Sequence, residues 1–283
     1  MRSIPCLFTA VLLPAVLKER GYQTAMFGKW HLGLGEPNLP NSRGFEFFHG
    51  FLGDMMDDDY YYNHRRHGVN YMRLNSETID PEGHATDLFT QWTCDWIKQY
   101  RDDAPFFIYL AYNAPHSPIQ PPEDFLERYR AKHPDVPERR AKPAALIEHM
   151  DAGIGRVLAA LEETGRAKNT LVIFTSDNGG SIPHGSDNGP LAGGKQDMLE
   201  GGRRYQGKPY YCVRHGDWKL LANDASEPYR LYNLADDPEE TTDMAGRRPE
   251  VFTRLKQALD AHIARCAATP WRAPDGKGPG EID

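Results

Sequence analysis

Three short apolar runs have the length and residue types of buried β-strands. They are residues 24–27, 106–112 ("FFIYLAY") and 170–175 ("TLVIFT"), all rich in β-branched or aromatic side chains. We therefore expect three strands in the core of one sheet.

Helical periodicity separates these runs. In residues 85–101 and 141–164 the large apolar side chains recur every three or four positions, and Gly165 supplies a helix stop. Residues 13–20 also read as a helix that leads into the first strand. Helix and strand thus alternate along the chain. That order predicts an α/β sheet flanked by helices, with right-handed crossovers.

The pattern changes after residue 204. The stretches "YYCVRHGDWKLL" and "YRLYNLADDPEET" read as short antiparallel strands joined by turns, and an amphipathic helix covers about 250–266. We expect residues 1–204 to form the main α/β domain and residues 205–268 a small antiparallel subdomain with a terminal helix. Residues 269–283 read as a disordered tail.

Composition narrows the possible partners. The 283 residues carry a net charge of −7, so a broad basic face for nucleic acid is not expected. No apolar run is long enough to span a membrane. The four cysteines form no C-x-x-C pair, which argues against a zinc knuckle. The basic and apolar start of the chain resembles a signal peptide but lacks a clear cleavage site, so it reads equally well as a helix.

Polar side chains follow each of the three expected strands. Lys29 and His31 come after the first, His116 after the second, and Asp177 and Asn178 after the third. In open α/β sheets, ligand sites gather beyond the carboxyl ends of the strands. We therefore expect these five residues to converge if the strands lie side by side.

Their chemistry suits an anionic substrate and a hard cation. Asp177 and Asn178 offer oxygen donors for Ca²⁺ or Mg²⁺ rather than zinc, although an Asx turn would also explain them. Lys29 can hold an anionic oxygen. His31 and His116 can donate hydrogen bonds or act as general acid or base.

A Gly-rich stretch, "LAGGKQDMLEGG", adds Lys195, and a flexible surface loop is its alternative interpretation. Together, Lys195 and the five strand-end residues indicate a hydrolytic site for a phosphate or sulfate ester.

The motifs resemble those of one known family. "GYQTAMFGKWHLG" closely resembles the second signature of the sulfatases, a branch of the alkaline-phosphatase-like superfamily. The similarity extends to "APHSP", "TSDNGG", "GGKQDMLEGG" and "VRHGDWKLL", and it covers most of residues 13–266. It implies an alkaline-phosphatase-like mixed sheet flanked by helices.

The resemblance also implies roles for individual residues. Lys29 and Lys195 would grip the sulfate, and His31 would contact the nucleophile, a formylglycine made from Cys or Ser. His116 would contact the sulfate ester and assist the leaving oxygen. Asp177 and Asn178 would bind the metal, usually calcium.

The chain departs from this family's pattern at the nucleophile. Sulfatases carry C-x-P-x-R or S-x-P-x-R upstream of the lysine–histidine signature, and an acidic pair further upstream completes the metal site. Neither Cys6 nor Ser3 begins such a motif. Residues 226–230 ("SEPYR") match formally but lie in the C-terminal region, which indicates a chance match. The acidic residues 57–59 could replace the metal ligands, but a solvated loop explains them better.

A second departure follows "LEGGRR", where the chain passes almost at once to the C-terminal strands. An internal deletion explains this, and the sheet would then lack strands and expose apolar edges.

Two functions remain open. The first is a sulfuric ester hydrolase acting on a sulfated small molecule or glycan, with a phosphate or phosphonate ester hydrolase as a lesser variant. The second is a truncated, inactive relative that keeps an anion-binding pocket. A formylglycine-generating enzyme would be a partner only of a fuller chain. The family suggests a periplasmic, secreted or lysosomal location, but the sequence does not assign one.

Overall fold

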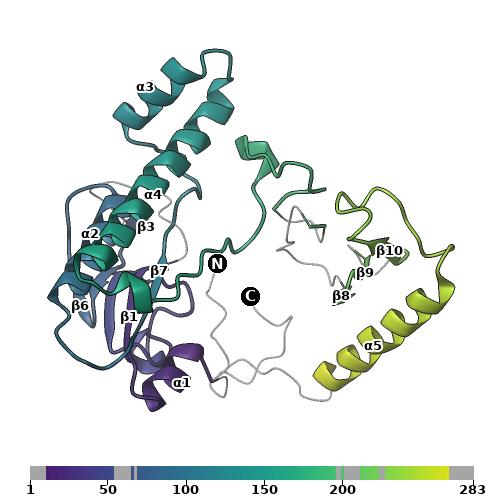
Figure 1. The fold of residues 1–283 in the computed structure, drawn as a ribbon, viewed down its shortest axis with the longest axis horizontal. Coiled ribbons are helices and arrows are strands. Elements are labelled where there is room, and N and C mark those ends of the chain that lie inside the picture. Colours follow the sequence, from purple (N-terminus) through teal and green to yellow (C-terminus); the bar gives the residue numbers. More distant parts are fainter. Residues whose placement is uncertain are drawn as a thin grey trace. The chain divides into compact units, whose positions relative to one another are not determined.

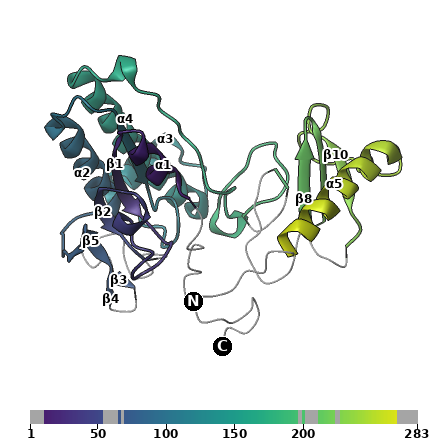
Figure 2. The same ribbon diagram turned by 90° about the horizontal axis from the view of Figure 1, so that it is seen from below.

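A computed structural model describes residues 11–53, 65–66, 69–195, 199–200, 211–222 and 227–267. The chain divides between Val172 and Ile173 into two compact units, each of which is described by itself. Figures 1 and 2 show the elements of each unit.

The first unit contains a mixed five-stranded sheet and four helices. The helices are α1 (Leu13–Glu19), α2 (Ala85–Gln99), α3 (Glu123–Lys132) and α4 (Glu138–Glu163). The sheet strands are β1 (Gln23–Lys29), β2 (Phe47–Phe51), β5 (Met72–Leu74), β6 (Glu77–Thr78) and β7 (Phe106–Ala111), and a separate hairpin pairs β3 (Arg65–Arg66) with β4 (Val69–Asn70). The short 3₁₀ helices η1 (Asn41–Arg43) and η2 (Ala167–Asn169) complete it.

The strand order is β6-β5-β2-β1-β7. β1 pairs in parallel with β2 on one side and β7 on the other, whereas β5 and β6 are antiparallel. Central β1 is buried throughout its middle, as its continuous apolar run predicts. The expected strands at 24–27 and 106–112 are therefore confirmed as neighbours.

Successive side chains of β7 point to opposite faces of the sheet, so their contacts show which elements cover each face. Phe106 and Ile108 pack against α2 and α4, in a cluster that contains Ile97 and Leu161. Phe107 faces the other way, toward the chain that follows β1. Figure 1 shows α2 and α4 along the sheet. The helical periods at 13–20, 85–101 and 141–164 correspond to α1, α2 and α4, so these predictions are confirmed.

A glycine row lets the strands approach closely at the carboxyl end of β1. A Cβ placed on Gly28 would lie 2.0 Å from the carbonyl oxygen of Ala111, and one on Gly50 would lie 2.0 Å from that of Gly28. Gly28 also has φ of +98°, which favours glycine. Glycine is thus required directly before Lys29.

The second unit contains a three-stranded antiparallel sheet and a helix. Its elements are η3 (Ile182–His184), β8 (Tyr211–His215), β9 (Trp218–Ala222), β10 (Arg230–Asn233) and α5 (Pro249–Ala267), in the sheet order β10-β9-β8. Leu220, Leu231 and Leu255 form its buried centre, and Figure 2 shows α5 packed along the sheet. The predicted antiparallel strands and terminal helix are confirmed.

The prediction of a third core strand at residues 170–175 is wrong. Residues 170–176 have no strand structure, and Leu171 and Ile173 are 85% and 77% exposed. Apolar residues form a strand only where a neighbouring strand pairs with their backbone, and no strand among the described residues pairs with residues 170–176. The domain boundary expected at 204/205 stays a prediction, and the tail at 269–283 lies outside the described residues.

Candidate functional site

Trp30 anchors the segment that carries Lys29 and His31. Its side chain is buried, and its Nε1–H donates to the carbonyl oxygen of Asn38 at 2.8 Å. Its backbone N–H donates to Phe51. His31 follows in the left-handed region, with φ of +53°. The buried tryptophan therefore fixes where the half-buried Lys29 and His31 leave the sheet.

His116 lies in the turn after β7. Its backbone N–H donates to the carbonyl oxygen of Asn113 at 2.9 Å, and its ring Nδ1 lies 2.9 Å from the carbonyl oxygen of Ser117. Because a carbonyl oxygen accepts only, Nδ1 is the donor in this contact. The turn therefore orients the imidazole.

The structure brings these two segments to one edge of the sheet. β1 and β7 are parallel neighbours, with Gly28 opposite Ala111 in register. Lys29 and His31 therefore leave the same sheet edge as the turn that carries His116. This agrees with the convergence expected at the ends of parallel strands.

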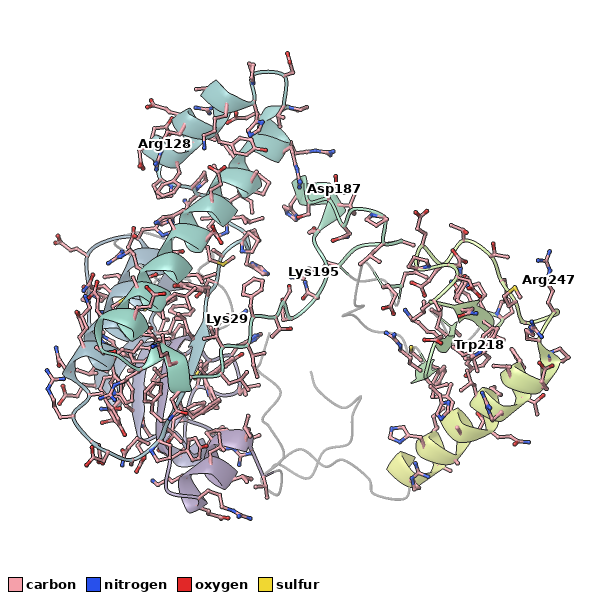
Figure 3. The ribbon with its side chains drawn as sticks, in the orientation of Figure 1. Lys29, Arg128, Asp187, Lys195, Trp218 and Arg247 are labelled. Carbon is pink, nitrogen blue, oxygen red and sulfur yellow. The ribbon has the colours of Figure 1, made fainter. Side chains whose placement is uncertain are left out.

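The remaining predicted residues belong to the second unit. Asp177 is exposed, and Asn178 and Lys195 are half-buried. The Asn178 Nδ2 donates to the carbonyl oxygen of Gly179 at 2.8 Å, so that bond occupies the amide nitrogen rather than Oδ1. Figure 3 labels Lys29 in the first unit and Lys195 in the second. Convergence of the two groups stays a prediction.

Asn188 was missed by the sequence analysis. Its carboxamide accepts from Gly180 N at 2.8 Å and donates to Gly193 O at 2.9 Å. An Asn-Gly pair in a Gly-rich stretch marks a turn, but nothing in the sequence indicates which backbone groups the amide will reach.

The donors at Asp177 and Asn178 fit a hard cation in kind. A carboxylate and an amide oxygen are the ligand types that Ca²⁺ prefers, but Ca²⁺ takes about six to eight oxygens. These two residues would therefore hold it only as part of a larger shell.

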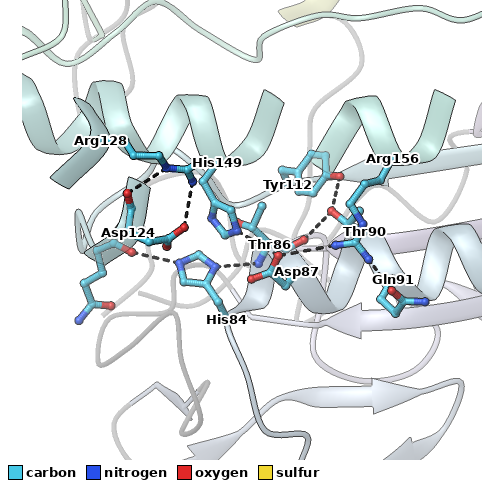
Figure 4. Close-up of polar contacts among 11 residues, drawn as sticks. His84, Thr86, Asp87, Thr90, Gln91, Tyr112, Asp124, Arg128, His149 and Arg156 are labelled. Carbon is cyan, nitrogen blue, oxygen red and sulfur yellow. Dashed lines mark hydrogen bonds and ion pairs between the residues drawn. The ribbon is translucent and has the colours of Figure 1, made fainter. Parts of the chain in front are cut away.

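A second group of potential metal ligands lies in the first unit. Ligand atoms of His84, Asp87 and His149 lie within 4.8 Å of one another (Figure 4). His84 Nδ1 accepts from Thr86 N at 3.1 Å, and its Nε2 lies 3.0 Å from the carbonyl oxygen of Gln120. Both ring nitrogens of His84 are therefore engaged.

His149 gives a further reason to regard this group as structural. Its Nε2 lies 3.0 Å from Asp87 Oδ1, and its buried Nδ1 has no hydrogen-bond partner. A metal on Nε2 would place the proton on Nδ1, where nothing accepts it. Donation from Nε2–H to Asp87 instead leaves Nδ1 as an unpaired acceptor, and the contact links α4 to the first turn of α2.

The Asp87 carboxyl is adapted to this contact. Its burial alone would raise the pKa, but the hydrogen bond from His149, with the nearby positive charge of Arg156, lowers the pKa below its usual value. The carboxylate therefore stays ionised at the start of α2, where the helix dipole also favours it.

Comparison with known proteins identifies the family. Residues 8–205 match the family model of the sulfatases, and the chain belongs to the sulfatase family. This confirms the resemblance that the motifs around Lys29, His116 and Asp177 carry. Proteins of this family generally use a metal ion and a formylglycine.

Two mammalian relatives illustrate the similarity. The chain is 35% identical to mouse arylsulfatase J over 203 residues, which cover 69% of this chain and 33% of that protein. It is 31% identical to human N-acetylgalactosamine-6-sulfatase over 210 residues, covering 68% and 38%. The chain thus spans 33% and 38% of the lengths of these two relatives.

Solved structures confirm the alkaline-phosphatase-like fold. Ps i-CgsB in complex with k-i-k-neocarrahexaose has a TM-score of 0.80 and 21% identity, covering 99% of this chain and 78% of that one. BT4656 in complex with its substrate D-glucosamine-2-N,6-O-disulfate has a TM-score of 0.68 and 17% identity, covering 98% and 85%.

Within the described residues, no helix combines the length and apolar character needed to cross a membrane.

Proposed function

We propose that this chain carries the binding site of a sulfuric ester hydrolase that acts on a sulfated glycan or small molecule. The observation that supports it best is the pairing of β1 with β7, which brings the Lys29–His31 segment and the His116 turn to one sheet edge. The family match supports sulfate as the anion. The neighbours with carrageenan and glucosamine ligands support a sulfated sugar as the substrate class.

Each residue has a chemical role in the proposal. Lys29 and Lys195 supply positive charge to the sulfate oxygens. His116, oriented through Nδ1, holds the ester oxygen and gives a proton as the alcohol leaves. His31 donates a hydrogen bond near the nucleophile. Asp177 and Asn178 would hold a divalent cation, which stabilises negative charge on the sulfate when bound.

The second candidate is a non-catalytic anion-binding chain. One observation favours it: the C-x-P-x-R motif that supplies the nucleophile is not found among the 283 residues.

Turnover separates the two candidates. The purified chain with Ca²⁺ should hydrolyse an aryl sulfate little or not at all, measured by release of the phenol. Ser226→Ala is the matched control, because residue 226 opens the formal S-x-P-x-R match. Robust turnover that this variant leaves unchanged would show that a nucleophile exists elsewhere in the chain.

Binding tests the site itself. Sulfate should bind to the chain, and Lys29→Ala should weaken the affinity about tenfold in calorimetry, because one charged contact is lost. Lys98→Ala is the control, since Lys98 pairs with Glu163 on the surface.

Ca²⁺ should bind weakly. Tighter binding of phosphate than of sulfate would favour the phosphate ester variant.

A further inference from the structure

The carboxamide of Asn188 holds two separate stretches of the second unit together. It accepts from Gly180 N–H at 2.8 Å and donates to the carbonyl oxygen of Gly193 at 2.9 Å. The backbone N–H of Lys195 also donates to the carbonyl oxygen of Gly180 at 2.9 Å. The two Asn188 hydrogen bonds and this backbone hydrogen bond together connect the two stretches, and we call this connection the Asn188 bridge.

The two stretches carry the proposed ligand-binding groups. Gly180 lies two residues after Asn178, and Gly193 lies two residues before Lys195. The bridge therefore joins the segment with the cation donors to the segment with the sulfate-binding lysine. A Gly-rich stretch separates Asn178 from Lys195 in the sequence. Without the bridge, such a loop would leave the distance between the two groups variable.

The fit around the bridge is close. A Cβ on Gly180 would lie 2.4 Å from Ser186 Cβ, and a Cβ on Gly194 would lie 2.7 Å from Ile182 Cγ1 and 2.9 Å from Gly180 O. Glycine at these two positions lets the backbone stretches meet at the distance that Asn188 spans. The arrangement is therefore specific and not an incidental surface contact.

The chemistry of the bridge requires an amide at position 188. Gly180 N–H needs an acceptor and Gly193 O needs a donor, and asparagine offers both on one short side chain. An aspartate would keep the acceptor but would place negative charge beside the Gly193 and Gly180 carbonyl oxygens.

We propose that Asn188 is a positioning residue that sets the separation between the Asp177–Asn178 oxygens and the Lys195 segment, so that cation and sulfate bind together. This inference rests on the proposed function. It extends that function to a residue that touches neither ligand and acts only through the backbone of Gly180 and Gly193.

Calorimetry with calcium chloride and sodium sulfate on the full chain tests the role. Asn188→Ala should weaken sulfate binding about tenfold, as expected for loss of the hydrogen bonds that hold the site. In the wild type, Ca²⁺ should strengthen sulfate binding, and Asn188→Ala should abolish that coupling. Asn188→Asp keeps the hydrogen bond from Gly180 N–H, so its sulfate affinity should lie between those of the wild type and Asn188→Ala.

Two controls separate positioning from general damage to the fold. Ser181→Ala removes the Ser181 Oγ contact with His184, which lies in the same loop but does not join the two stretches, and it should change affinity less than twofold. In a Lys195→Ala background, Asn188→Ala should have no further effect on sulfate, because the residue acts through the lysine segment.

Hydrogen exchange supplies a readout that needs no ligand. The amides of Gly180 and Lys195 should exchange faster in Asn188→Ala, while amides of β9 stay protected. Unchanged exchange, or full additivity with Lys195→Ala, would overturn the positioning role while the proposed function stands. If the wild type binds neither sulfate nor Ca²⁺, the proposed function fails and the positioning role fails with it.

Discussion

His49 shows how burial changes a single residue. Its ring stacks on Trp92, with ring centroids 3.4 Å apart and planes 9° from parallel. Burial lowers the pKa of His49 from 6.5 to about 4, because the charged form loses hydration. The unfolded chain therefore binds a proton at this position at a higher pH than the folded chain does.

This difference predicts acid sensitivity. As pH falls from about 6.5 toward 4, the unfolded state takes up the proton first, so the free energy of unfolding decreases. Between pH 7 and pH 5 the decrease from His49 should be about 2 kcal/mol. His49→Phe keeps the stacking and should remove this part of the pH dependence in urea denaturation. His133→Gln, an exposed control, should not. Equal pH dependence of wild type and His49→Phe would contradict the prediction.

Lys219 is a buried charge in the second unit. Its Nζ lies 2.7 Å from Glu200 Oε1 and 2.9 Å from Glu240 Oε1, and the Lys219 and Glu240 side chains are 4% and 0% exposed. The Glu240 Oε1 contact is close but is not aligned as a hydrogen bond. Charge pairing therefore makes this burial tolerable.

Removing one partner should destabilise the second unit. Lys219→Met leaves the Glu240 carboxylate buried without its cation, which should cost about 3–5 kcal/mol in the free energy of unfolding. Lys256→Met is the control, since Lys256 pairs with Asp260 and lies over the Tyr229 ring near the surface, contacts that should be worth about 1 kcal/mol together. The double variant Lys219→Met with Glu240→Gln should recover part of the loss. Similar costs for the two lysine variants would rule out the buried-charge account.

At the level of elements, backbone pairing decides whether an apolar run becomes a strand. All of β7 pairs with β1 from Gln23 to Gly28, and the sequence predicts both strands. Residues 170–175 are similarly rich in β-branched and aromatic side chains, but no strand among the described residues pairs with them, and Phe174 is 74% exposed. Composition predicts the tendency to form a strand, whereas the neighbour supplies the hydrogen bonds.

This exposed run should promote association. The four consecutive apolar side chains at residues 171–174 are exposed, and exposed apolar segments of this kind favour association between molecules. Ile173→Lys with Phe174→Lys should reduce concentration-dependent association in light scattering. Val69→Lys is the control, because Val69 is a single exposed apolar residue at 47% exposure. No difference between these variants would argue that the run is covered in solution.

At the scale of the whole molecule, the boundary between the two units falls within this same run, after Val172. Exposed, unpaired backbone is the preferred site of proteolysis. Within residues 69–195, chymotrypsin should cut first after Leu171 or Phe174, as read by mass spectrometry. Leu171→Gln with Phe174→Gln should delay the cut. An earlier cut within α4 would contradict the division.

The sequence by itself determined the family, several of the helices and two of the three expected core strands. Periodicity located α2, α4 and α5, because a helix depends on residues three and four positions apart. The motifs around Lys29, His116 and Asp177 identified the family for a related reason, since each motif is contiguous.

Only the tertiary structure decided the features that join residues far apart in sequence. It placed β7 beside β1 and showed why Gly28 has no room for a side chain. It also showed that Asn188 reaches Gly180 and Gly193, and that no strand among the described residues pairs with residues 170–175. These outcomes depend on which backbone groups meet in space, and a side chain's type does not reveal its partner.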